Sequence, residues 1–117
     1  MSKKILVIDD DEDILEIISI TLQYQDFEVI TRSDSQVILE IELIKPDLIL
    51  MDNWLQGVRG SDLCKTIKND KAIKNIPVIL LSAVNDIQKV ANECDANAYL
   101  AKPFDLTELE TLVQQLT

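Results

Sequence analysis

Short apolar runs, each ending at a polar residue, recur along this 117-residue chain. Residues 4–8, 48–52 and 78–81 are apolar almost throughout, a pattern that predicts strands buried on both faces of a sheet. Residues 27–31 alternate between polar and apolar positions, as expected of a half-exposed edge strand, and residues 98–101 form a brief fifth run. The chain therefore contains five predicted strands.

Amphipathic stretches lie between these runs, with apolar residues at every third or fourth position, and they predict helices. Asp34 or Ser35 can cap the second of them, and Pro46 closes it. Five strands that alternate with five helices predict a single α/β domain over residues 1–117, with a parallel sheet, helices on both faces and right-handed crossovers. The predicted helices cover residues 14–25, 35–44, 61–69, 85–93 and 109–116.

The composition limits the class of protein. The chain has 11 basic and 21 acidic residues, a formal net charge of -10, which disfavours direct binding to nucleic acid or to an anionic membrane. It has no histidine, so the commonest zinc ligand and the commonest general base are absent. Cys64 and Cys94 lack metal-binding spacing and indicate small, partly buried thiols in a reducing compartment. We find no signal peptide and no membrane-spanning run, so a cytoplasmic protein is expected.

Four of the predicted strands end at a polar residue of definite chemistry: Asp9 and Asp10, Asp52, Ser82 and Lys102. Each residue alone could be an ordinary helix cap or turn. Five consecutive acids at residues 9–13 repel one another, however, and exceed what a helix start needs. Because parallel strands end at the same edge of a sheet, where ligands bind in open α/β folds, these side chains are predicted to meet around one point.

The predicted cluster suits phosphoryl chemistry. Clustered carboxylates need a counter-charge, and Mg²⁺ supplies it while keeping positions for water and a phosphoryl oxygen. A carboxylate such as Asp52 can act as nucleophile and form an aspartyl phosphate. Both glycines of the chain, Gly57 and Gly60, follow Asp52, which predicts unusual backbone angles or close backbone approach in that loop.

These motifs resemble the receiver domains of two-component response regulators, over essentially the whole chain. The resemblance implies a doubly wound, five-stranded parallel sheet in the order 2-1-3-4-5, a flavodoxin-like three-layer sandwich. It also implies a stand-alone, chemotaxis-regulator-like protein. The matching motifs are Ile8-Asp9-Asp10-Asp11, Asp52 with Gly60 eight residues later, Leu81-Ser82-Ala83, and Tyr99-Leu100-Ala101-Lys102-Pro103-Phe104.

The resemblance also implies a role for each matching residue. Asp52 would accept the phosphoryl group, and Asp10 and Asp52 would bind Mg²⁺ directly, with Asp9 acting through water. The backbone carbonyl of Trp54 would be a further metal ligand.

Three further residues would contact or sense the phosphoryl group. Ser82 would bind a phosphoryl oxygen, Lys102 would pair with the phosphoryl group across a cis bond to Pro103, and Tyr99 would follow Ser82 as the aromatic switch residue. Trp54 either shields the phosphoryl group, together with Val84, or points outward to a partner.

The expected function is a Mg²⁺-dependent phosphoacceptor switch. It would take a phosphoryl group from a sensor histidine kinase or a histidine-containing phosphotransfer protein and would then bind a downstream effector. It would not be an enzyme beyond slow self-dephosphorylation, and it would not bind nucleic acid or membrane directly.

Two other classes stay open. A small phosphatase with an aspartate nucleophile would need an acid at position 54, where Trp54 stands. A degenerate receiver that acts only as an interaction module would not need the complete residue set. The sequence also departs from the family at Gln56, where proline is usual, which predicts a more mobile loop. At Asp95-Ala96, where Gly-Ala is common, Asp95 would have to accept a left-handed backbone.

Overall fold

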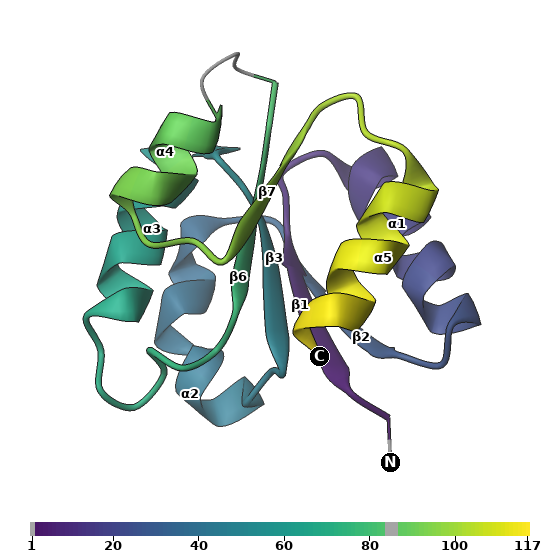
Figure 1. The fold of residues 1–117 in the computed structure, drawn as a ribbon. Coiled ribbons are helices and arrows are strands. Elements are labelled where there is room, and N and C mark those ends of the chain that lie inside the picture. Colours follow the sequence, from purple (N-terminus) through teal and green to yellow (C-terminus); the bar gives the residue numbers. More distant parts are fainter. Residues whose placement is uncertain (1, 84–86) are drawn as a thin grey trace.

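A five-stranded parallel sheet forms the centre of the molecule (Figure 1). The computed structural model describes residues 2–83 and 87–117. The strands lie in the order β2-β1-β3-β6-β7, which is the predicted order 2-1-3-4-5 of the sheet strands. Both the parallel sheet and its order are thus confirmed. The strands are β1 (Lys4–Ile8), β2 (Glu28–Arg32), β3 (Leu48–Asp52), β6 (Val78–Ser82) and β7 (Ala98–Ala101).

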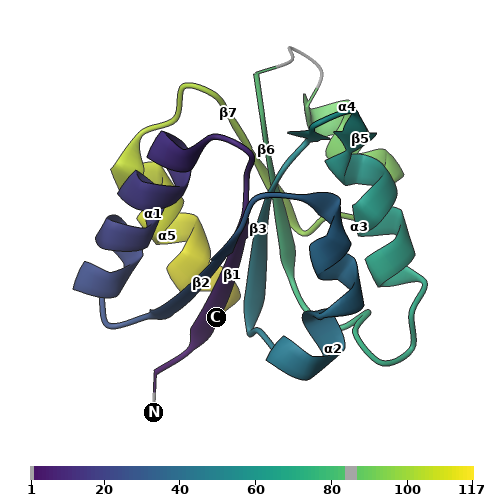
Figure 2. The ribbon, with the colours of Figure 1, turned by 180° about the vertical axis from the view of Figure 1, so that it is seen from behind.

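Helices cover both faces of this sheet, as Figures 1 and 2 show from opposite sides. The two faces carry separate apolar clusters, because alternate residues of each strand point to opposite sides. Every residue of β3 and β6 is buried, which explains their continuous apolar sequences. One face packs α1 (Glu12–Tyr24) and α5 (Leu106–Leu116); the other packs α2 (Ile41–Ile44), α3 (Gly60–Lys68) and α4 (Ile87–Glu93).

The region predicted as one helix over residues 35–44 is divided. A 3₁₀ helix, η1 (Ser35–Leu39), is followed by the single turn of α2. Asp34 caps η1 as predicted, since its carboxylate accepts the Gln36 N–H at 2.9 Å. Lys45 ends α2 in a left-handed conformation, φ 54°, just before Pro46. The β-branched residues of this stretch favour helix weakly, which accounts for the short elements.

The helix predicted over residues 85–93 is described from Ile87 onward, and residues 84–86 lie outside the described part of the chain. Asp95, which follows this helix, has φ 62° and so accepts the left-handed backbone that the sequence required of it. No helix in the described residues is long and apolar enough to cross a bilayer.

A small hairpin after β3 was missed by the sequence analysis, which expected only a loop. It pairs β4 (Trp54–Leu55) with β5 (Val58–Arg59) in antiparallel fashion. Gln56 and Gly57, with φ 50° and 89°, form its two-residue turn. Two positive φ angles are what such tight hairpin turns require. A proline at position 56 could not adopt this angle, so the departure from the family and the hairpin belong together.

Cys64 and Cys94 are fully buried and lie next to each other. The Cys64 thiol donates to the Cys94 carbonyl, with 3.3 Å between sulfur and oxygen. Burial, with the neighbouring Cys94 as a smaller cause, raises the pKa of Cys64 from 9.0 to about 12. Both thiols are therefore more deeply buried than predicted, and Cys64 stays protonated in the folded state.

We expect Cys64 to resist alkylation by iodoacetamide at pH 8 in the native protein and to react once urea unfolds the chain, since the thiolate is the nucleophile. The folded state holds this proton more tightly than the unfolded state. Its contribution to stability is therefore lost as pH rises above the unfolded value of 9.0. Mass spectrometry after timed alkylation measures the first effect. Urea denaturation between about pH 8 and 10, with Cys64→Ala as control, measures the second. Equal alkylation rates in both states would contradict this prediction.

Candidate functional site

The carboxyl ends of four strands bring the predicted site residues to one edge of the sheet. Asp9 follows β1, Asp52 ends β3, Ser82 ends β6, and Lys102 comes directly after β7. Asp9, Asp52 and Ser82 are all buried, although their side chains are polar. The parallel register places Met51 beside Ile8 and Asp52 beside Leu81, so the strands end at nearly the same level.

Lys102 lies between two carboxylates. Its Nζ atom is 3.0 Å from Asp9 Oδ2 and 2.9 Å from Asp52 Oδ1. The bond from Lys102 to Pro103 is cis, as the resemblance implied. Asp9 is held further by its other oxygen, Oδ1, which accepts the Asp11 N–H at 2.9 Å. One ammonium thus serves two buried acids, and the three side chains form a single charged unit.

Asp9, Asp10 and Asp52 can each place a carboxylate oxygen within 4.8 Å of the others. Asp10 lies closer to solvent than the other two acids. With one ammonium for three carboxylates, this donor set carries excess negative charge and consists only of oxygens, which fits Mg²⁺. Asp11 has a different role, because its carboxylate caps α1 by accepting the Asp13 and Ile14 N–H groups. The consecutive acids thus divide between a candidate cation site and a helix cap.

Burial and the neighbouring charges shift the pKa values of Asp52 and Lys102. Burial raises the pKa of Asp52 above its ordinary value of 3.8, and Asp9 adds to the rise, although Lys102 opposes it. Burial alone would lower the pKa of Lys102, but hydrogen bonds to Asp52 and Asp9 outweigh burial and raise it. Lys102 has two acidic partners that together outweigh its burial, whereas the lysine that Asp52 shares with Asp9 does not offset the burial of Asp52.

Trp54 is close to Asp52 through its backbone. Its N–H donates to Asp52 Oδ2 at 3.2 Å, while its side chain is 57% exposed. The exposure agrees with an outward-pointing indole, the alternative that the sequence left open beside shielding. Val84, the other residue in that argument, lies outside the described residues.

Asn53 was not singled out from the sequence, yet it organises the loop behind Asp52. Its side-chain oxygen accepts the Ser61 N–H at 3.0 Å, and its backbone carbonyl accepts the Gly60 N–H at 2.8 Å. These bonds satisfy the first N–H groups of α3, whose own N-cap residue, Arg59, makes no side-chain cap. The sequence feature that could have identified Asn53 is its position directly after a buried strand and before a loop that contains glycine.

The two glycines of this loop serve different needs. A Cβ atom on Gly60 would lie 2.3 Å from the Asp52 backbone oxygen, whereas one on Gly57 would meet nothing within 4 Å. Gly57 needs its positive φ instead. Both predictions made from the sequence, unusual angles and close approach, are confirmed, one at each glycine.

We therefore expect Gly60→Ala to destabilise the protein by about 2–3 kcal/mol, because the backbone behind Asp52 must move. Gly57→Ala should cost only about 1 kcal/mol, the cost of a left-handed angle without a clash. Urea denaturation of both variants measures the difference, and Gly57→Ala is the matched control. Equal losses would contradict the close approach at Gly60.

Ser82 and Tyr99 lie on the neighbouring strands β6 and β7. Ser82 is 5% exposed, and its carbonyl accepts the Lys102 N–H at 2.8 Å, which ties the serine to the lysine through the backbone. Tyr99 is 37% exposed and lines a surface pocket with residues of α5, including Thr111 and Leu112. The tyrosine is thus at the surface, within one strand of the buried hydroxyl.

Comparison with known proteins identifies the family of this chain. The response regulator receiver domain family matches residues 5–114, so the chain belongs to this family. It functions in two-component signalling as a receiver domain. The alkaline phosphatase synthesis transcriptional regulatory protein PhoP of Bacillus subtilis is 35% identical over 99% of this chain and 49% of its own length.

Solved structures agree in fold. A two-component response regulator from Clostridium difficile superposes with a TM-score of 0.89 at 27% identity, covering 98% of this chain and 95% of that one. The receiver domain of a sensor histidine kinase from Pseudomonas aeruginosa, with magnesium coordinated in its active-site cleft, superposes with a TM-score of 0.88 at 26% identity. That match covers 99% of this chain and 98% of the other. The present chain spans about half the length of the curated relatives it matches.

Proposed function

We propose that Asp52 is the phosphoacceptor of a Mg²⁺-dependent receiver. The observation that carries the proposal is the ion-paired unit at the sheet edge, in which Lys102 bridges Asp9 and Asp52 within hydrogen-bonding distance. Phosphoryl transfer asks mainly for positioning and charge neutralisation, and this unit supplies both. The phosphatase alternative lacks its acid, because Trp54 occupies that position.

In the proposed transfer, a carboxylate oxygen of Asp52 forms a bond to phosphorus while the bond from phosphorus to the donor histidine nitrogen breaks. The electron pair of the broken bond stays on the imidazole, and the product is an aspartyl phosphate. Lys102 moves its hydrogen bond from the Asp52 oxygen to a phosphoryl oxygen. Ser82, which is buried on β6, donates a hydrogen bond from its hydroxyl to another phosphoryl oxygen.

Asp10 and Asp52 would hold Mg²⁺ through carboxylate oxygens, Asp9 through water, and Trp54 through its backbone carbonyl. When bound, the cation supplies positive charge that neutralises the phosphoryl oxygens. The fit rests on the three carboxylates that converge within 4.8 Å. The surrounding residues orient these acids: Asp11 and Trp54 donate backbone N–H groups to Asp9 and Asp52.

The phosphodonor would be a protein, a histidine kinase or a phosphotransfer protein. An apolar pocket of about 420 Å³ opens beside Lys102, and it suits contact with an apolar protein surface. Its lining combines residues of α1, the residue directly after β6, the β7–α5 connection and the start of α5: Ile14, Ile17, Ala83, Lys102, Pro103, Phe104 and Leu106.

The output would come from a change at the surface that carries Tyr99. Ser82 would move toward the phosphoryl group and Tyr99 would follow it inward, which changes the surface formed by α4, β7 and α5 and its preference for an effector. The pocket of about 610 Å³ that Tyr99 shares with α5 lies on this surface. The proposal also takes residues 1–117 as a single receiver domain that does not bind nucleic acid directly, an expectation that rests on the sequence and its formal net charge of -10.

The test is incubation with acetyl phosphate, with and without Mg²⁺, followed by intact-mass measurement. We expect the mass of one phosphoryl group to be added only when Mg²⁺ is present. Trp54, the sole tryptophan, should report Mg²⁺ binding by fluorescence. A pure interaction module would show neither the added mass nor the fluorescence change.

A further inference from the structure

Among the described residues, no strand pairs with the outer edge of β2. The charges along β2 would complement those of a second, antiparallel copy of the same strand. β2 is terminal in the sheet order and pairs with β1 on one side. Its sequence, Glu28-Val29-Ile30-Thr31-Arg32, begins with an acid and ends with a base. An exposed strand edge presents free N–H and C=O groups that can pair with another strand.

The backbone of β2 shows which residues face outward. The Glu28 N–H donates to the Lys3 carbonyl and the Arg32 carbonyl accepts the Asp9 N–H, so these two residues direct their backbone groups toward β1. Directions alternate along a strand, and Val29 and Thr31 therefore direct theirs outward. The Thr31 carbonyl meets only the guanidinium of Arg32 among the described residues, at 2.8 Å.

We propose that this edge pairs with the β2 edge of a second copy of the chain, antiparallel and centred on Ile30. In this register, Val29 of each copy lies opposite Thr31 of the other, and such a pair exchanges both of its N–H···O bonds. Val29 and Thr31 direct their backbone N–H and C=O groups outward. Pairing that is centred on Ile30 therefore brings these groups opposite each other. The twofold axis passes between the two Ile30 residues, and the interface is isologous.

The same register places Glu28 of each copy opposite Arg32 of the other. Opposite charges across an antiparallel pair stabilise it, and like charges destabilise it. Within one chain both side chains form ion pairs with partly exposed partners: Glu28 Oε2 is 4.0 Å from Lys4 Nζ, and Arg32 Nη2 is 3.5 Å from Glu40 Oε1. These contacts leave both groups able to turn toward a second copy, with Arg32 releasing the Thr31 carbonyl.

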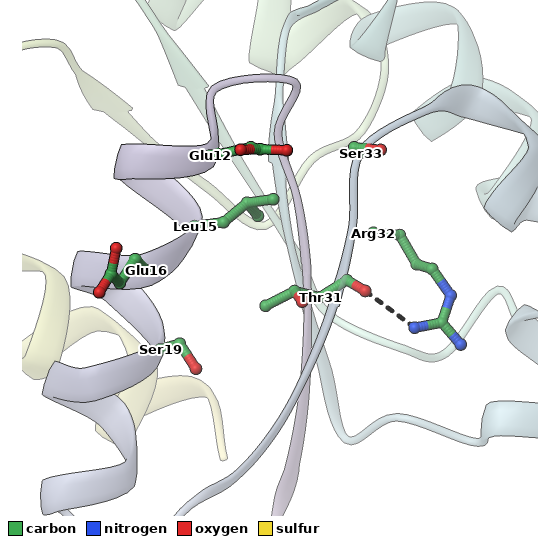
Figure 3. Close-up of a pocket in the computed structure, with 7 residues that line it drawn as sticks. All are labelled: Glu12, Leu15, Glu16, Ser19, Thr31, Arg32 and Ser33. Carbon is green, nitrogen blue, oxygen red and sulfur yellow. Dashed lines mark hydrogen bonds between the residues drawn. The ribbon is translucent and has the colours of Figure 1, made fainter.

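The side chains on the two faces of β2 also leave room for the second copy to approach this edge. Ile30 packs against the apolar cluster on the α2 face, while Val29 packs on the α1 face. A pocket of about 460 Å³ lies between α1 and β2. Figure 3 shows its lining residues, with the Thr31 side chain directed toward α1 and Arg32 on the other side. The pocket gives space beside Thr31 for Val29 of the second copy. Leu15 supplies an apolar surface there.

The test is sedimentation velocity of the full chain up to about 1 mM, the range in which weak pairs form. Salt near 150 mM screens the repulsion between two chains of charge -10 each. Glu28→Arg alone and Arg32→Glu alone should each raise the dimer Kd at least about tenfold, because like charges then face each other. Their equimolar mixture should form a heterodimer, and the double variant should dimerise as wild type does.

The controls separate the edge from general charge effects. Glu42→Arg and Lys71→Glu change the same charges at exposed positions off the edge and should leave the Kd unchanged. Thr31→Pro removes an outward N–H and should abolish the dimer, whereas Thr31→Val keeps that N–H and should not. Asp52→Asn should dimerise normally, so failure of the phosphoacceptor proposal would not affect this one. A wild type that stays monomeric at the highest concentration, or a mixture that fails to pair, overturns the proposal.

Discussion

Asp52→Asn should abolish the addition of a phosphoryl group by acetyl phosphate, while the protein stays folded. The amide keeps the shape of the carboxylate and its place beside Lys102, but it has no nucleophilic oxygen. The loss in rate should be complete within detection. The measurement is intact mass over time in the presence of Mg²⁺.

The fold of this variant should survive because burial already penalises the ionised Asp52, whose pKa is raised. Lys102 keeps Asp9 as a partner at 3.0 Å. The change in stability should therefore stay within about 1 kcal/mol. Asp62→Asn, at an exposed acid in the first turn of α3, is the control and should gain phosphate at the wild-type rate. Phosphate incorporation by Asp52→Asn at the same rate would show that another residue is the acceptor.

Lys102→Met should lower the free energy of unfolding at pH 7, without Mg²⁺, by about 2–3 kcal/mol. Methionine keeps much of the length of the side chain but leaves two buried acids, Asp9 and Asp52, without their shared counter-charge. The upper range for breaking a buried pair is reduced here because the Lys102 side chain is 20% exposed. For a domain of this size the loss corresponds to a fall in Tm of about 8–12 °C.

The destabilisation should depend on pH and on metal. Loss of Lys102 removes a factor that lowers the pKa of Asp52, so this pKa rises further above the unfolded value of 3.8. The folded variant then binds its proton at higher pH than the unfolded chain does. Its stability should accordingly recover as pH falls from 7 toward that value, and the gap to wild type should narrow.

Mg²⁺ should raise the Tm of Lys102→Met more than that of wild type, because it replaces the missing positive charge. Lys89→Met, at an exposed lysine of α4, is the matched control and should behave as wild type in every condition. Urea denaturation at pH 5 and pH 7, with EDTA or with Mg²⁺, measures all of these effects. A destabilisation that is independent of both pH and metal would mean that Lys102 acts through packing alone.

The predictions for Asp52→Asn and Lys102→Met distinguish the loss of the nucleophile from the loss of the counter-charge. Both residues belong to the ion-paired unit that Asp9, Asp52 and Lys102 form. Asp52 should be dispensable for folding and essential for phosphoryl transfer. Lys102 should matter for both, because the same ammonium that balances Asp9 and Asp52 in the resting protein is positioned to receive the phosphoryl oxygens. In the proposed function, this dual use is the reason why Lys102, directly after β7, contacts Asp9 after β1 and Asp52 at the end of β3.

The sequence by itself determined the architecture and the residues of the candidate site. Short continuous apolar runs that alternate with amphipathic helices predict a covered parallel sheet, and parallel strands end at one edge, so the meeting of Asp9, Asp52 and Lys102 followed from the pattern. The roles of the two glycines after Asp52 could also be predicted from the sequence, because glycine alone tolerates both a left-handed backbone angle and close contact with another part of the backbone.

Only the tertiary structure decided the features that depend on short elements and on contacts across the fold. The hairpin at Gln56 and Gly57 has two-residue strands, too short for any periodicity, and η1 replaced a helix because weak local preference yielded to packing. The cap that Asn53 places on α3 joins residues eight apart, and the outward groups of β2 follow from its pairing with β1. Which acid pairs with Lys102, and which caps α1, likewise depends on distances that exist only once the strands are assembled.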